Sequence, residues 1–130
     1  MISYGKQDIT KADIEEVIKV LRSDFLTQGP AVPFFEKKLC NYTGAKYAVA
    51  VNSCTSALHL SCLALGLGTG DILWTSPITF VASANCALYC GATVDFIDIE
   101  PDTALMSVEK LAVKLEHAEK KGKLPKIVIP

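Results

Sequence analysis

The chain has 130 residues, a length typical of one domain; half of them are apolar and 21% are charged. This composition is sufficient for one hydrophobic core, and it lacks the low apolar content and high net charge of disordered chains. Thirteen Lys and Arg residues are balanced by fourteen Asp and Glu residues. The balance argues against the clustered positive charge of a phosphate-backbone binder, so we expect no nucleic-acid partner.

Targeting and membrane segments are not evident in the sequence. No apolar run approaches the roughly 20 residues that span a bilayer. The first residues, Met1 to Lys11, contain no apolar core of a signal peptide. We therefore expect a cytoplasmic chain with no membrane association.

Two helices are expected in the first 45 residues. Thr10 and Asp13 have the spacing of a capping box, and four apolar residues then follow helical spacing: Ile14, Val17, Ile18 and Leu21. A second helix is predicted over 33–43, because Pro33 suits a first helical position and Gly44 suits the residue after the end. We expect a helical segment over residues 1–45.

Strands and helices alternate over residues 46–130. Strands are predicted at Tyr47–Val51, Ile72–Thr75, Thr93–Ile99 and Ile127–Ile129, and the helices between them at Thr55–Leu65, at Phe80–Cys90 and after Ser107. Such alternation is typical of an α/β fold, with a mostly parallel sheet covered by helices on both faces. Since no helix follows the last strand, we expect these residues to be part of a larger domain.

A candidate anion site follows the first predicted strand. Asn52 to Ser56 opens a helix, and hydroxyl groups cluster there on Ser53, Thr55 and Ser56. A helix N-terminus offers free N–H groups and a partial positive charge, which suit a phosphate group. The alternative is simple N-capping by Ser and Thr, and the local pattern leaves both open.

Phe80 follows the second predicted strand and is expected at the same edge of the sheet as Thr55. Its ring could stack on a planar ligand or pack in the core, and the pattern does not decide between them. The glycine-rich stretch Gly66–Gly70 follows a helix and precedes a strand. This order is the reverse of a dinucleotide fingerprint, so we interpret it as a connecting loop.

Metal-binding and triad-type catalytic sites are not indicated. Two pairs, His59 with Cys62 and Cys86 with Cys90, have helical spacing, but free cysteines are usually small buried apolar residues. An acidic stretch contains Asp95, Asp98, Glu100 and Asp102. Positions in turns or in solvent explain these residues better than a divalent-metal site does. We predict no metal and no catalytic residue in this chain.

Taken together, several segments resemble the DegT/StrS family of nucleotide-sugar aminotransferases. The resemblance covers nearly the whole chain in order, at Tyr4–Gln7, Leu26–Pro30, Val32–Glu36, Gly44–Ser53, Thr55–His59, Gly70–Asp71, Ser76–Asn85 and Val94–Ile99. It implies the N-terminal part of the large domain of the aspartate-aminotransferase fold, also called the PLP type I fold. It also implies the cofactor pyridoxal 5′-phosphate (PLP) for full-length members of the family, and we expect these residues alone to bind it weakly or not at all.

The resemblance also implies roles for individual residues. Cys54, Thr55 and Ser56 match the segment that holds the PLP phosphate, and Phe80 matches the aromatic residue that stacks on the pyridine ring. The residues that match the lining of the sugar-nucleotide pocket are Tyr4, Leu26, Thr27, Gln28 and Gly29.

The reaction implied by the resemblance is transfer of an amino group from glutamate to the 4-keto carbon of a UDP-linked 4-keto-6-deoxy sugar, as in pseudaminic acid biosynthesis. The family is also homodimeric. We expect the PLP-linking lysine, the rest of the large domain and the small C-terminal domain to lie beyond Pro130, so that these residues alone are inactive. The alternative is a non-catalytic binding or assembly module that keeps the phosphate-like site.

Overall fold

A computed structural model describes residues 5–130, which form two compact units, one ending at Ala50 and the other comprising Val51–Pro130. Tyr4 lies outside the described residues. The first unit contains helices α1 (Lys11–Leu21) and α2 (Ala31–Thr43). No helix within residues 5–130 combines the length and the apolar character needed to cross a bilayer.

The start of α1 confirms the predicted capping box. The Thr10 hydroxyl accepts the Asp13 N–H at 3.4 Å, and the Asp13 carboxylate accepts the Thr10 N–H at 2.7 Å. These bonds satisfy two donors that the helix itself leaves without acceptors. Neither α1 nor α2 has a buried residue in this unit.

Helix α2 begins two residues before the predicted start. Pro30 is its N-cap, which makes Pro33 the third helical residue. A proline is tolerated there because the first-turn N–H groups have no acceptor within the helix. The start predicted at Pro33 was therefore wrong by two residues.

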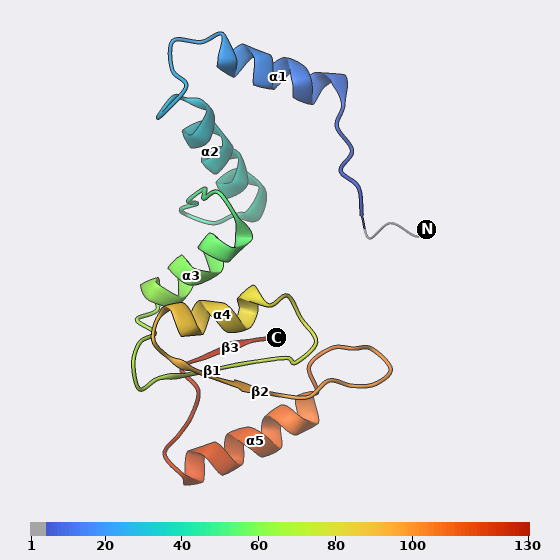
Figure 1. The fold of residues 1–130 in the computed structure, drawn as a ribbon, viewed down its shortest axis with the longest axis vertical. Coiled ribbons are helices and arrows are strands. Elements are labelled where there is room, and N and C mark those ends of the chain that lie inside the picture. Colours follow the sequence, from blue (N-terminus) through green and yellow to red (C-terminus); the bar gives the residue numbers. More distant parts are fainter. Residues whose placement is uncertain (1–4) are drawn as a thin grey trace. The chain divides into compact units, whose positions relative to one another are not determined.

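The second unit is a three-layer α/β arrangement. Its parallel sheet has the order β2-β1-β3, made by β2 (Thr93–Phe96), β1 (Ile72–Thr75) and β3 (Ile127–Ile129). Helices α3 (Cys54–Ala64) and α4 (Ala82–Tyr89) cover one face, and α5 (Val108–Lys120) covers the other (Figure 1). The predicted α/β class with a parallel sheet is confirmed.

Each face of the sheet has its own apolar core. Leu73 packs with Cys62 and Cys86 between the sheet and the α3–α4 layer, while Trp74 packs with Ile97 and Ala118 beneath α5. The alternation of side chains along β1 sends these two neighbours to opposite faces. The outer surfaces of the two helical layers also differ, because α3 and α4 contain no charged residue whereas α5 is amphipathic.

The strand predicted at Tyr47–Val51 is wrong. This segment joins no ladder, and the side chains of Tyr47 and Val49 are exposed. The Ala50 N–H instead donates to the Glu36 carboxylate at 2.8 Å. An apolar run has strand character, but it becomes a strand only where a neighbour accepts its backbone hydrogen bonds.

Two other predicted elements are shorter in the structure. The strand predicted to reach Ile99 ends at Phe96, and the side chains of Asp95 and Asp98 accept the N–H of the residue that follows each of them. The Asp98 bond can take the place of a ladder bond for the Ile99 N–H, whereas Asp95 lies inside β2 and the Ile97 N–H still donates to the Thr75 carbonyl at 2.9 Å. The helix predicted over Phe80–Cys90 is α4, and α3 is shifted by one residue from its prediction.

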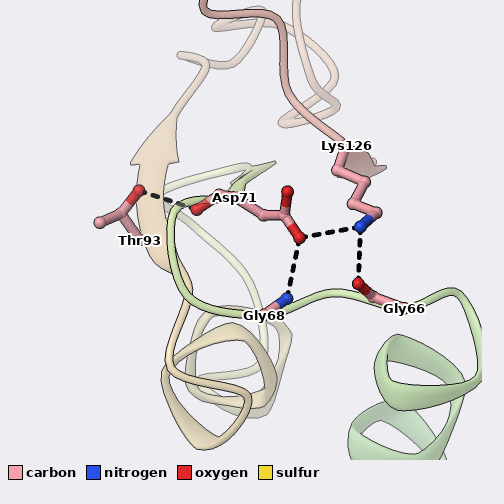
Figure 2. Close-up of polar contacts among 5 residues, drawn as sticks. All are labelled: Gly66, Gly68, Asp71, Thr93 and Lys126. Atoms are coloured by element: carbon pink, nitrogen blue, oxygen red, sulfur yellow. Dashed lines mark hydrogen bonds and ion pairs between the residues drawn. The ribbon is translucent and has the colours of Figure 1, made fainter.

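A polar clamp joins the beginnings of the three strands (Figure 2). The Lys126 ammonium donates to the Asp71 carboxylate at 2.9 Å and to the Gly66 carbonyl at 2.6 Å. The same carboxylate accepts the Gly68 N–H at 2.9 Å, and the Thr93 hydroxyl donates to the Asp71 carbonyl at 3.2 Å. Asp71 therefore holds the loop before β1 against both neighbouring strands.

We predict that Asp71 makes folding stability depend on acid pH. The hydrogen bond from Lys126, followed by that from the Gly68 N–H, lowers the pKa of Asp71. The carboxylate thus stabilises the fold above its unfolded pKa of about 3.9, and this contribution is lost as pH falls through the lower folded pKa. Urea unfolding should show Asp71→Asn less stable than the parent at neutral pH, with the difference shrinking as pH falls below the unfolded pKa of about 3.9.

Asp102→Asn is the matched control, because no ion pair engages Asp102 within the described part of the chain. It should leave the unfolding free energy near that of the parent at every pH. An Asp71→Asn variant with the parent's stability at neutral pH would contradict a stabilising role for the clamp.

The buried hydroxyl of Thr75 leads us to a second prediction about stability. Its side chain is fully buried, and its hydroxyl oxygen has no hydrogen-bond partner within residues 5–130. A buried polar group left unpaired is unfavourable by about 1–3 kcal/mol. Thr75→Val keeps the shape without the hydroxyl, so urea unfolding should give a free energy of unfolding about 1 kcal/mol higher than the parent's. Thr75→Ser, which keeps the hydroxyl and loses the methyl group, should be less stable than the parent.

Candidate functional site

The N-terminus of α3 is organised by three neighbouring polar side chains. Ser53 is the N-cap, and its hydroxyl accepts the Ser56 N–H at 3.1 Å. The Ser56 hydroxyl lies 3.0 Å from that of Ser53 and donates to the Asn52 side-chain carbonyl at 2.8 Å. This network fixes the first turn and leaves Ser56 with both of its donors already used.

Thr55 and Cys54 supply the donors that remain. Their backbone N–H groups occupy the first two helical positions, which have no acceptor within the helix. The hydrogen bonds found in residues 5–130 do not engage the Thr55 hydroxyl, and the first turn contains no acidic side chain. Free donors, the positive end of the helix dipole and the absence of a carboxylate from this turn suit a phosphate group.

Phe80 lies in the loop between β1 and α4, residues 76–81. Its carbonyl accepts the Ser83 N–H at 2.9 Å, which holds its backbone at the start of α4. The side chain is 54% exposed, and Ile78 in the same loop is exposed as well. Of the two sequence interpretations, core packing does not describe this ring, which is accessible for stacking.

The substrate-binding residues predicted in the first unit lie in the loop between α1 and α2. Leu26, Gln28 and Gly29 line a pocket of about 260 Å³ within this unit. Gln28 has a φ of 53°, a left-handed conformation unusual for a residue with a side chain. Gly29 approaches Phe25 so closely that an added Cβ would lie 3.0 Å from the Phe25 Cβ. A side chain at position 29 would therefore require Phe25 to shift by a few tenths of an ångström.

Several of the cysteines and acidic residues considered as metal ligands are buried or form ion pairs in the structure. Burial raises the pKa of the Cys62 thiol to about 12, with further contributions from Cys86 and Cys90. Asp95 pairs with Lys114 at 2.6 Å, and Asp98 pairs with Lys110 at 2.7 Å. Within the described residues, no group of three potential metal ligands comes together.

Asn52 was expected at the start of the candidate segment, but no role was predicted for its side chain, and the Asp71–Lys126 clamp was not predicted. Asn52 immediately precedes the N-cap, and its position was the available signal, since Asn side chains commonly bond to nearby backbone and hydroxyl groups. Asp71 and Lys126 lie 55 positions apart, and nothing local in the sequence connects them.

Comparison with known proteins gives a consistent family assignment. The model of the DegT/DnrJ/EryC1/StrS aminotransferase family matches residues 7–129. A Campylobacter jejuni protein named UDP-4-amino-4,6-dideoxy-N-acetyl-beta-L-altrosamine transaminase is 49% identical over 102 residues, which cover 78% of this chain and 27% of that relative.

Solved structures agree with the sequence comparison. A DegT DnrJ EryC1 StrS aminotransferase from Brucella abortus superposes with a TM-score of 0.81 at 34% identity, covering 92% of this chain and 34% of that one. A Streptococcus pneumoniae protein described as a sugar aminotransferase, solved in PLP and PMP forms, gives a TM-score of 0.79 at 37% identity. That match covers 85% of this chain and 28% of the other. The chain thus spans about a third or less of the length of these relatives.

Proposed function

Because this chain belongs to the DegT/DnrJ/EryC1/StrS aminotransferase family, we propose that it supplies the phosphate-binding part of a PLP-dependent sugar aminotransferase. The N-terminus of α3 binds the cofactor phosphate through the N–H groups of Cys54 and Thr55 and the Thr55 hydroxyl. Ser56 acts mainly by fixing the first turn through its bonds to Ser53 and Asn52. Phe80 stacks on the pyridine ring.

The observation that carries this proposal is the set of unused donors at the start of α3. A first turn closed by Ser53 and Ser56 holds two backbone N–H groups in fixed positions, next to the unengaged Thr55 hydroxyl. Preorganised donors of this kind bind an anion without further ordering of the chain. PLP, when bound, supplies an electron sink for the transfer of the amino group.

The substrate assignment is the finer part of the proposal. The name of the Campylobacter jejuni relative supports a UDP-linked 4-keto-6-deoxy sugar as acceptor, in synthesis of the pseudaminic-acid type. Glutamate is the proposed amino donor, on the basis of the resemblance. Leu26, Thr27, Gln28 and Gly29 are the proposed contacts to the sugar nucleotide, while the homodimer and the cytoplasmic location stay predictions.

Thr55→Ala tests the phosphate assignment. Pyridoxamine 5′-phosphate is the probe, because its amine does not react with surface lysines as the PLP aldehyde does. Loss of a hydrogen bond to a charged group amounts to about 1.5–3 kcal/mol, so the dissociation constant measured by fluorescence should rise about tenfold or more.

Ser61→Ala is the matched control, since it removes a hydroxyl from the same helix away from its N-terminus. It should bind the probe as the parent does, and pyridoxamine without the phosphate should bind neither protein appreciably. Equal affinities for the parent and Thr55→Ala would remove Thr55 from the phosphate site.

Phe80→Ala tests the stacking assignment separately. An aromatic stacking contact contributes about 0.5–1.5 kcal/mol, so affinity for pyridoxamine 5′-phosphate should fall about twofold to tenfold. Ile78→Ala removes an exposed apolar side chain from the same loop and should leave binding unchanged. If both variants bind with the parent's affinity and spectrum, Phe80 does not contact the cofactor.

A further inference from the structure

A second pocket lies on the face of the sheet that α5 covers, opposite the α3–α4 layer. It has a volume of about 220 Å³, and Ile72 and Trp74 of β1 contribute to its lining. The polar residues around it are Asp95 of β2 and, from α5 and the turn after it, Lys114, His117, Lys121 and Lys123. Three lysines and one aspartate therefore converge on an apolar base.

The turn after α5 explains how Lys123 reaches this pocket. Gly122 has a φ of 63°, and its N–H donates to the Glu119 carbonyl at 3.0 Å. The Lys123 N–H then donates to the Ala118 carbonyl at 2.8 Å. The left-handed conformation of Gly122 thus ends α5 and folds the chain back over the last turn of the helix. As a result, Lys123 lines the same pocket as Lys121.

The charges around the pocket are not balanced. Lys114 is fully engaged, because its ammonium lies 2.6 Å from the Asp95 carboxylate, donates to the Phe96 carbonyl at 2.6 Å and sits 4.8 Å from the centre of the Trp74 ring. Lys121 and Lys123 form no ion pair within residues 5–130. The one carboxylate of the pocket is therefore used, and two ammonium groups remain.

The dipole of α5 accounts for only some of the lysines at this end of the helix. Lysines near a helix C-terminus are stabilised by the last carbonyl groups, which explains Lys120 and Lys121. Lys123 lies beyond the helix, and it lines the same pocket as Lys121. A bound anion would offset the positive charge that these two side chains bring to the pocket.

We propose that this pocket binds a small phosphoryl anion through Lys121 and Lys123, with His117 as a further polar contact. The small volume favours inorganic phosphate or the phosphate group of a small metabolite over a whole nucleotide. Lysine ammonium groups bind phosphate as point charges and need no planar geometry. The site is separate from the α3 N-terminus and does not depend on the proposed aminotransferase function.

Trp74 allows a direct test, because it is the single tryptophan of the chain and lines the pocket. Inorganic phosphate and glycerol phosphate are titrated separately into the 130-residue chain, with sodium chloride holding the ionic strength constant. We expect a saturable change in Trp74 fluorescence with at least one of them. The double variant Lys121→Gln/Lys123→Gln should weaken binding about tenfold or more.

Lys120→Gln is the matched control, since it removes the same charge from the same helix end outside the pocket and should bind as the parent does. Thr55→Ala should also leave the Trp74 response unchanged, which separates this site from the α3 N-terminus. The proposal is overturned if neither anion gives a saturable response, or if Lys120→Gln weakens binding as much as the double variant.

Discussion

Strand β1 is hydrogen-bonded on both sides and buried on both faces, and the arrangement of the second unit depends on it. Leu73 and Trp74 are consecutive, yet each belongs to a different core cluster. The α3–α4 layer and α5 are thus positioned by adjacent side chains of one strand. The Asp71 clamp precedes this strand and the loop that contains Phe80 follows it, so β1 positions both segments.

Elements whose signals are local were predictable from the sequence. The capping box of α1, the N-cap of α5 and the apolar run of β1 each follow from neighbouring residues. Tyr47–Val51 failed because its pattern describes burial, while a strand also needs a partner for its backbone. Beyond the end of β2, the Asp98 side chain offers the Ile99 N–H a local acceptor in place of a neighbouring strand.

The position of the candidate phosphate site in the chain was predictable from the sequence, but the hydroxyl and N–H groups that remain free to donate were not. Three hydroxyls at a helix start indicate an anion site or a cap, and the structure contains the cap. Which hydroxyls stay free depends on the side-chain network, where Ser56 is committed to Asn52 and Thr55 is not. Contacts between residues distant in the chain, such as Lys126 with Asp71, carry no local signal.

The two helical layers of the sheet have contrasting chemistry, and this contrast has a consequence for solution conditions. Ion pairs join α5 to β2 and to the segment that follows β2, at Lys114–Asp95 and Lys110–Asp98, whereas α3 and α4 contain no charged residue. Simple salts screen partly exposed ion pairs, while sulfate strengthens apolar packing. Chloride therefore weakens contacts that only the α5 layer makes, whereas sulfate strengthens the apolar cores on both faces of the sheet, so the two salts act on different sets of contacts.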